Sequence, residues 1–151
     1  MKFGLDNVSE KYKEQYMSAG FPPKICSLFV EKLNSGNRLK TQILDVGCGK
    51  GFAGELLKQM GFFRLTGIDC SKSLLQVSKN KNCYEQLDQV AFGMDYTVVP
   101  EVHHNKYDFV ISSSMINNDG FDAQVFKHLL SCLKMGGFVI FATKLNFAGE
   151  N

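Results

Sequence analysis

A glycine-rich segment next to an acidic residue is the part of this 151-residue sequence best suited to hold a ligand. A strand-like run from Ile43 to Val46 leads into three alternating glycines, Gly47, Gly49 and Gly51, and a helical run follows. Glycine permits positive φ and lets a ligand lie against bare backbone, where N–H groups at the helix start can bind polar atoms. The order of strand, glycine loop and helix therefore predicts a ligand site where the strand ends.

The spacing of the glycines and acidic residues separates one class of ligand from another. A dinucleotide fingerprint, G-x-G-x-x-G, needs a third glycine at position 52, which is Phe52. Asp45 would repel phosphates but would attract a cation. Asp69 ends the next strand-like run, 20 positions after Gly49, where a carboxylate can accept both hydroxyls of a ribose. S-adenosylmethionine has both an adenosine sugar and a cationic arm, and is the candidate that satisfies both carboxylates.

Short apolar runs alternate with helical stretches from residue 42 onward, and these elements would position the glycine loop. Strands buried on both faces read as continuous apolar runs and are typical of parallel sheets covered by helices on both sides. The pattern therefore predicts an α/β fold with a Rossmann-like, doubly wound parallel sheet. The expected strands cover 43–47, 65–69, 89–92, 108–112 and 138–142. The expected helices are 52–60, one capped by Ser71, a short piece near Tyr84, and one from Asp122 to the glycines at 136–137.

The first forty residues form a separate pattern of two amphipathic helices. Tyr12 and Tyr16 recur on one face of the first, and the second runs from Pro23 to a stop at Gly36. We assign residues 1–40 as N-terminal helices and residues 41–151 as the ligand-binding domain. The two tyrosines could close over the ligand as part of a lid, or they could merely pack their helix.

The composition favours one globular domain, with 44% hydrophobic and 21% charged residues. A net charge of +2 is too weak for a nucleic-acid binder, so we expect no nucleic-acid partner. The first residues contain no apolar stretch of signal-peptide length, and no apolar run approaches about 20 residues, so no membrane association is expected. The five cysteines form no Cys-x-x-Cys pair, which argues against zinc sites and disulfides and predicts a cytoplasmic protein, with the nucleus left open.

Four motifs in order resemble those of class I S-adenosylmethionine-dependent methyltransferases. They are Asp45–Gly51, Gly67–Asp69, Tyr107–Val110 and Leu133–Phe138, and the resemblance covers about residues 40 to 144. Within this class, the segments 79–87 and 112–117 are most similar to the methyltransferase-like 27 (Williams–Beuren region) group.

The resemblance implies a role for each matching residue. The loop residues Gly47, Cys48 and Gly49 would lie against the methionine part of S-adenosyl-L-methionine, and Asp45 would bind its amino group. Asp69 would hold the ribose hydroxyls. The remaining contacts implied are Cys70 beside the adenine, Met94 and Asp95 at the adenine N6 amine, and Ser112 and Ser113 at the methionine end.

The resemblance also implies methyl transfer to a small-molecule or protein acceptor that the sequence does not identify. Attack on a sulfonium methyl is an in-line displacement that depends mainly on alignment, so no catalytic base has to be visible. Enzymes of this class that methylate bases or glutamine have an Asn-Pro-Pro-Tyr-type tetrad after the fourth strand. This sequence has Ser112–Met115 at that place, so methylation of this kind is not supported. The alternatives are a non-catalytic or truncated cofactor-binding module and, less favoured, an NAD(P)-dependent oxidoreductase.

The C-terminal end raises a separate expectation. Class I domains usually have seven strands, but this sequence ends at Asn151, nine residues after the fifth expected strand, so the last two strands would be lacking. The run 138–142 would then be an uncovered apolar sheet edge, which invites pairing with another chain. We expect a fragment or isoform of a longer enzyme, self-association through this edge, or coverage by the N-terminal helices.

Several residues that resemble catalytic groups have simpler structural roles as their favoured interpretation. Cys48 is expected to pack as a small residue, and Asp108 to anchor the sheet. The polar surroundings of His103 and His104 predict a solvated loop. His128 is expected at a surface or boundary position. Asp119 and Asp122 lie in the loop where acceptors bind in this class, and helix capping is the expected role of Asp122.

Overall fold

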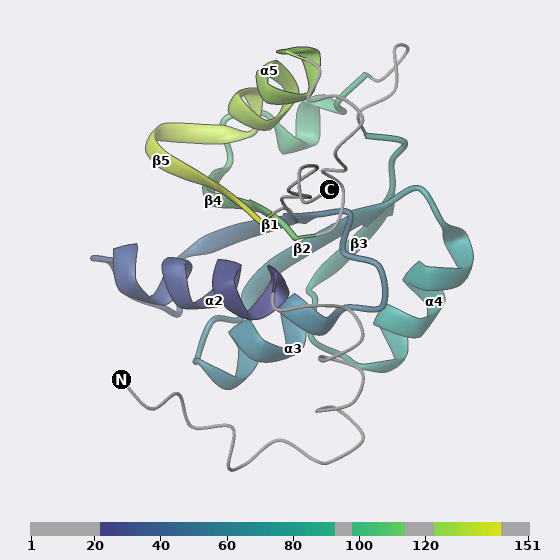
Figure 1. Cartoon of the computed structure of the whole chain (residues 1–151), viewed down its shortest axis with the longest axis horizontal. Coiled ribbons are helices and arrows are strands. Elements are labelled where there is room, and N and C mark those ends of the chain that lie inside the picture. The colour runs from purple at the N-terminus through teal and green to yellow at the C-terminus, as the bar shows by residue number, and fades with distance from the viewer. Residues whose placement is uncertain (1–21, 93–97, 114–122, 143–151) are drawn as a thin grey trace, which may run out of the picture.

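The computed structural model describes residues 22–92, 98–113 and 123–142, and these form one parallel sheet with helices on both sides (Figure 1). The strand order is β3-β2-β1-β4-β5, and all four strand pairs are parallel. The predicted Rossmann-like α/β class is therefore confirmed, with five strands in the described part of the chain. The strands are β1 (Gln42–Val46), β2 (Arg64–Asp69), β3 (Gln86–Gln89), β4 (Tyr107–Ser112) and β5 (Leu133–Phe141).

The helices cover the two faces of this sheet. Figure 1 shows α5 (Ala123–Ser131) on the opposite side of the sheet from α2 (Pro22–Leu33) and α3 (Phe52–Gln59). The other helices among the described residues are α4 (Lys72–Asn80) and the 3-10 turn η1 (Glu101–His103). Ser71 accepts a hydrogen bond from the Leu74 N–H and caps α4 as predicted. Within the described ranges, no helix is both long and apolar enough to span a membrane.

Alternate residues of the central strands pack into two separate hydrophobic cores, one on each face of the sheet. Ile43 and Phe109 belong to the cluster beneath α2 and α3, whereas Leu44 and Val110 belong to the cluster on the other face with Leu129 of α5. Both faces of β1 and β4 are therefore buried, which explains their continuous apolar sequences. The division of the chain at residue 40 stays a prediction.

The largest difference from the predicted elements concerns β3. This strand covers 86–89 instead of 89–92, and its sequence, Gln-Leu-Asp-Gln, is mostly polar. It lies at an edge of the sheet, where pairing with Thr66 to Asp69 of β2 needs no apolar face. The short helix expected near Tyr84 is wrong as well, because this residue lies in the irregular connection between α4 and β3.

The end of α5 also differs from the prediction. The helix ends at Ser131 and β5 already begins at Leu133, so the two glycines at 136–137 do not terminate a helix. A Cβ on Gly137 would lie 2.9 Å from the Asp108 carbonyl oxygen, so glycine here permits close packing of β5 on β4.

The outer edge of β5 is partly apolar and exposed. Phe138 is 43% exposed and Phe141 is 41% exposed, and β5 has a strand neighbour only on its β4 side among the described residues. Self-association through this edge stays a prediction. The expectations for Tyr12, Tyr16, Asp119 and Asp122 fall outside the described residues.

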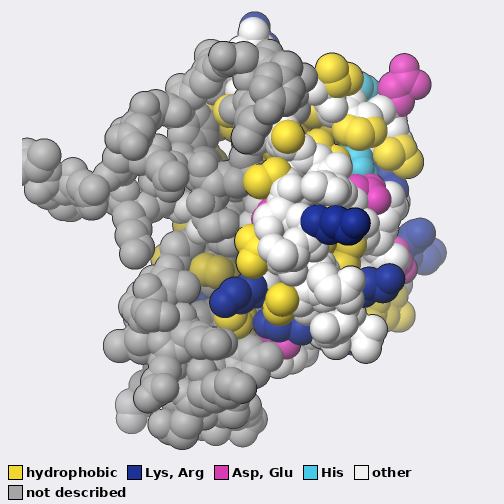
Figure 2. Space-filling view, turned by 90° about the vertical axis from the view of Figure 1, so that its right-hand side faces the viewer, with side chains coloured by type: hydrophobic (Ala, Val, Ile, Leu, Met, Phe, Trp, Pro, Cys, Tyr) yellow, Lys and Arg dark blue, Asp and Glu magenta, His cyan; other side chains and the backbone are white. Residues whose placement is uncertain are grey.

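The basic side chains on the face over α4 and β3 are separated from one another. Figure 2 shows Lys and Arg side chains spread over this face among hydrophobic and other side chains, without forming a continuous basic patch.

The prediction of a solvated loop is wrong for His103, although His104 is exposed as expected. The His103 side chain is completely buried, with Nδ1 2.8 Å from the Tyr107 hydroxyl and Nε2 3.0 Å from Asp88 Oδ2. The second contact is close enough for an ion pair but has poor hydrogen-bond geometry. His128 is half-buried, which confirms its boundary position.

Burial lowers the pKa of His103, so we expect its contribution to stability to depend on pH. A folded-state pKa below the unfolded value means that the native state favours the neutral ring, and this contribution is lost as the pH falls below about 6.5. The difference in free energy of unfolding between the unmodified chain and His103→Gln should therefore be largest near neutral pH and shrink toward about pH 5. Urea denaturation at several pH values measures it, and a difference that grows on acidification would contradict this account.

Candidate functional site

The predicted site residues meet at the carboxyl ends of β1 and β2. Asp45 is paired with Gly67 in the parallel register, and the chain leaves β1 one residue later to form the glycine loop that starts α3. Asp69 is the last residue of β2 and is beside this loop, since its Oδ2 accepts a hydrogen bond of 2.9 Å from the Gly49 N–H. The structure thus brings together the loop and both carboxylates, at the edge where open α/β sheets bind ligands.

The backbone N–H groups of the loop are already used within the protein. Gly47 and Cys48 both donate to the Ile68 carbonyl, at 2.8 and 3.0 Å, and Gly51 donates to the Cys48 carbonyl at 2.8 Å. With Gly49 donating to Asp69, four N–H groups of this turn have protein partners. The expectation that loop N–H groups would bind the ligand is therefore not met at these positions, and an anion such as a pyrophosphate would find few donors here.

Gly49 and Gly51 have different reasons for being glycine. Both have positive φ, +53° and +82°, which side-chain-bearing residues rarely adopt. A Cβ on Gly49 would meet no described atom within 4 Å, so the backbone here faces open space that a ligand can occupy. A Cβ on Gly51 would instead lie 2.6 Å from Ser78 Oγ and 3.2 Å from the ring of Tyr84, so this glycine permits internal packing.

Asp45 is a buried carboxylate with one unused oxygen. The residue is 2% exposed, and Oδ2 accepts a 2.6 Å hydrogen bond from the Tyr84 hydroxyl. Oδ1 is buried and has no hydrogen-bond partner among the described residues. Burial raises the pKa of Asp45 to about 7, the Tyr84 hydroxyl opposes this rise, and the charge of Asp69 adds to it. A buried acceptor without a donor is costly, and a ligand that supplies a cationic donor would satisfy it.

Asp69 is held in a fixed orientation. Its Oδ1 accepts from the Ser71 N–H at 2.8 Å, while Oδ2 accepts from Gly49. Each carboxylate oxygen can accept more than one hydrogen bond, so both retain capacity for hydroxyl donors. The side chain is therefore oriented by its neighbours and still able to hold a diol.

Four other predicted cofactor contacts lie within the described residues, namely Cys48, Cys70, Ser112 and Ser113. Cys48 is buried in the loop and burial raises the pKa of its thiol, as expected of a packing residue and not of a nucleophile. Cys70 is exposed just beyond β2. Ser112 and Ser113 are buried at the end of β4, and Ser112 Oγ has no partner among the described residues. Met94 and Asp95 lie outside the described residues.

Three residues that sequence reasoning did not assign to the site contribute to it. Tyr84 bonds to Asp45, and Ser78 of α4 donates from Oγ to the Gly49 carbonyl at 2.9 Å. Cys26 of α2 has its Sγ 3.9 Å from the Ser112 carbonyl oxygen, and burial raises its pKa to about 12, with the charge of Asp45 adding to the rise. None of them has a recognisable spacing to the loop. Glycines at 54 and 67, beyond those a ligand loop needs, were the available signal that a large side chain packs there.

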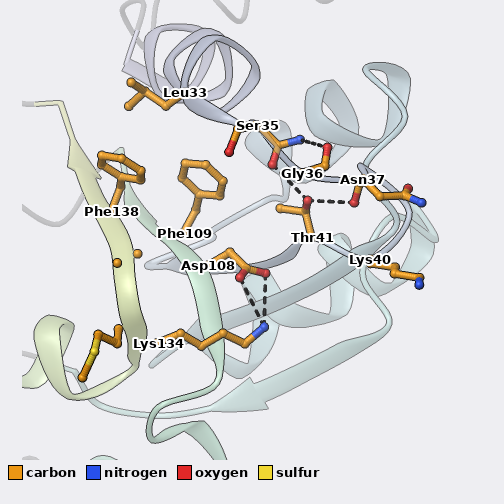
Figure 3. Close-up of a pocket in the computed structure, with 14 residues that line it drawn as sticks. Leu33, Ser35, Gly36, Asn37, Lys40, Thr41, Asp108, Phe109, Lys134 and Phe138 are labelled. Carbon is orange, nitrogen blue, oxygen red and sulfur yellow. Dashed lines mark hydrogen bonds and ion pairs between the residues drawn. The ribbon is translucent and has the colours of Figure 1, made fainter.

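A cavity of about 340 Å³ lies at the opposite ends of the strands, away from the two carboxylates (Figure 3). Asp108, at the start of β4, accepts a 2.8 Å bond from the Gln42 N–H and pairs with Lys134 Nζ at 3.2 Å. This confirms the predicted anchoring role of Asp108. Figure 3 shows Lys134 reaching this carboxylate and Thr41 bonded to its neighbours, so these polar groups of the cavity are internally satisfied.

Comparison with known proteins agrees with this geometry. Residues 38–146 match a family described as "Methyltransferase domain". The chain is 32% identical to a ubiquinone biosynthesis O-methyltransferase of Rickettsia typhi over 113 residues, covering 74% of this chain and 44% of that protein. It is 28% identical to human methyltransferase-like protein 27 over 104 residues, covering 69% of this chain and 41% of that protein. The chain therefore spans less than half the length of these relatives.

A solved structure shows the same fold at low sequence identity. A putative S-adenosyl-L-methionine-dependent methyltransferase from Methanococcus maripaludis superimposes with a TM-score of 0.63 and 16% identity, covering 93% of this chain and 65% of that one. The resemblance stated from the four motifs is thus confirmed at the level of the class.

Proposed function

Because the chain belongs to the methyltransferase-domain family, we propose that it binds S-adenosyl-L-methionine at the carboxyl ends of β1 and β2 and functions in methyl transfer. The observation that carries this proposal is the chemistry of the site. Among the described residues, the buried Asp45 Oδ1 is an acceptor without a donor, while four loop N–H groups are already bonded. Such a site suits a ligand that brings a cation and hydroxyl donors. It does not suit a pyrophosphate, which disfavours the oxidoreductase alternative.

The residues would divide the cofactor between them. In this proposal Asp45 binds the amino group of the methionine part through Oδ1, and Gly47, Cys48 and Gly49 lie beneath it. Asp69 accepts from the two ribose hydroxyls, because its carboxylate is already oriented by Gly49 and Ser71. The other proposed contacts of the adenine are Cys70, Met94 and Asp95. Those of the methionine end are Ser112 and Ser113.

The protein's contribution to the reaction would be alignment and exclusion of water. When bound, S-adenosylmethionine supplies a methyl group on a sulfonium, which is already activated for displacement. The chain's residues would fix the cofactor at both ends, which leaves the methyl presented to an acceptor. The acceptor is a small molecule or a protein side chain in this proposal. The name of the Rickettsia relative makes oxygen acceptors the first class to assay.

Calorimetry tests the proposed cofactor directly. The chain is expected to bind S-adenosylmethionine and S-adenosylhomocysteine in the micromolar range and NAD far more weakly. Asp69→Ala should weaken binding by about 1–3 kcal/mol, because the ribose hydroxyls lose their acceptor. Glu101→Ala, which removes an exposed carboxylate on η1, is the control and should bind as the unmodified chain does.

Thermal unfolding must accompany this measurement, because Asp69→Ala also removes the bonds to Gly49 and Ser71. A folded Asp69→Ala variant that binds as tightly as the unmodified chain would remove Asp69 from the site. Tight binding of NAD with none of S-adenosylhomocysteine would overturn the proposed function itself.

A further inference from the structure

We propose that Tyr84 is a positioning residue for the cofactor's amino group, acting by holding Asp45 through Oδ2 so that Oδ1 stays ionised and directed to the ligand. This inference rests on the proposed function, since it concerns how the same site recognises a cation. Tyr84 is separated from Asp45 by 39 positions and belongs to the connection between α4 and β3, so only the fold brings them together.

The hydroxyl of Tyr84 links a helix start to the carboxylate. The Gly54 N–H, in the first turn of α3, donates to the Tyr84 oxygen at 3.1 Å, and the Tyr84 O–H donates to Asp45 Oδ2 at 2.6 Å. Hydrogen bonds in such a chain polarise one another, so the tyrosine is a stronger donor to the carboxylate than an isolated hydroxyl would be. A short bond from a neutral donor to a carboxylate stabilises the ionised form.

The ring of Tyr84 is held by three glycines from different parts of the fold. A Cβ on Gly54 would lie 2.6 Å from the Tyr84 hydroxyl oxygen, and one on Gly67 of β2 would lie 3.1 Å from the ring. A Cβ on Gly51 would be 3.2 Å from it. The glycines at these three positions thus leave the space that the ring fills, and the hydroxyl has little freedom to leave Asp45.

The chain on both sides of Tyr84 is tied to the same elements. Lys81 Nζ pairs with Glu55 of α3 at 2.8 Å, and Lys58 Nζ of α3 donates to the Asn82 carbonyl. On the other side, the Glu85 N–H donates to the Leu65 carbonyl of β2 at 2.8 Å. The tyrosine is therefore positioned by contacts that are independent of Asp45.

Among the described residues, the Tyr84 hydroxyl is the hydrogen-bond donor that favours the ionised form of Asp45. Burial raises the pKa of Asp45 toward neutrality, the Tyr84 hydroxyl lowers it, and the charge of Asp69 adds to the rise. The neighbouring thiols are neutral near pH 7, since burial and Asp45 raise their pKa values. Of the residues that the structure describes, the titratable groups that face Asp45 are Cys26 of α2, Cys48 of the loop, Asp69 of β2 and Tyr84.

The test is the pH dependence of S-adenosylhomocysteine binding, measured by calorimetry from about pH 6 to about pH 9. A cationic amine binds the ionised carboxylate better, so affinity should weaken as the pH falls through the pKa of Asp45 in the free protein. Tyr84→Phe should bind about fivefold more weakly near pH 7, with the midpoint about one pH unit higher, and should approach unmodified affinity near pH 9. Tyr107→Phe removes the hydroxyl of another buried tyrosine and should leave the profile unchanged.

The outcomes are separable. Failure of the unmodified chain to bind would overturn the proposed function and this inference with it. Binding by the unmodified chain, with Tyr84→Phe weakened equally at every pH or not at all, would overturn only the inference. If Tyr84→Phe does not fold, incorporation of 3-fluorotyrosine, a stronger donor, should move the midpoint to lower pH, and an unmoved midpoint would overturn the inference.

Discussion

Replacing Asp45 with Asn is expected to increase the free energy of unfolding of the ligand-free chain near pH 8 by about 1–3 kcal/mol. The reason is the cost of a buried charge. Burial raises the pKa of Asp45 from 3.8 to about 7. This difference corresponds to about 4 kcal/mol spent on ionising the folded protein above pH 7. Asn avoids that cost, and its side-chain oxygen can still accept from Tyr84. Burying its NH₂ group costs about 1–3 kcal/mol, which offsets part of the gain.

The sign of the pH dependence follows from the same shift. An acid whose folded-state pKa is raised favours the native state while it is protonated, and this contribution is lost as the pH rises from about 4 through about 7. The advantage of Asp45→Asn should therefore be present near pH 8 and vanish near pH 4. Urea denaturation of both chains at the two pH values measures it, and an Asn variant that is less stable near pH 8 would contradict the assignment.

The same variant should lose cofactor binding, because the neutral amide has no negative charge to attract the ligand's ammonium group. A chain that becomes more stable and less able to bind would show that Asp45 is kept for recognition at the expense of stability. Calorimetry with S-adenosylhomocysteine provides the second half of this test. Asp108→Asn, in which the altered carboxylate lies at the opposite end of the sheet, is a matched control that should retain binding.

Replacing Gly54 with Ala is expected to lower the free energy of unfolding by about 1–3 kcal/mol, although alanine favours helices by about 1 kcal/mol. Gly54 is buried within α3, and its new Cβ would lie 2.6 Å from the Tyr84 hydroxyl oxygen and 2.7 Å from ring carbon Cε2. Both the helix and the ring are held on several sides, so neither can move without losing contacts.

A double-mutant cycle identifies the cause. In a Tyr84→Leu background the atoms that collide are absent, so Gly54→Ala should become neutral or stabilising. Gly36→Ala is the control, since its Cβ would have no neighbour closer than 3.7 Å and should change stability little. Equal destabilisation by Gly54→Ala in both backgrounds would show that the tyrosine is not what requires glycine at position 54.

The periodicity of the sequence was sufficient to predict most of the sheet. β1, β2 and β4 lie where their apolar runs indicate, because strands buried on both faces require such runs. The polar edge strand β3 was misplaced, since one edge of the strand has no neighbour within the described part of the chain and its partly exposed faces need few apolar residues. His103 was misjudged for a related reason, because its burial depends on Asp88 and Tyr107, which come from two different strands.

The sequence by itself determined the positions of the glycine loop, Asp45 and Asp69, because local spacing along a strand, a turn and the following strand fixes them relative to one another. Only the tertiary structure decided how these groups are used. It showed that four loop N–H groups are bonded within the protein, that one Asp45 oxygen has no partner among the described residues, and that Tyr84 holds the other. Such facts depend on packing between elements that are distant in sequence, and packing leaves no periodic signal along the chain.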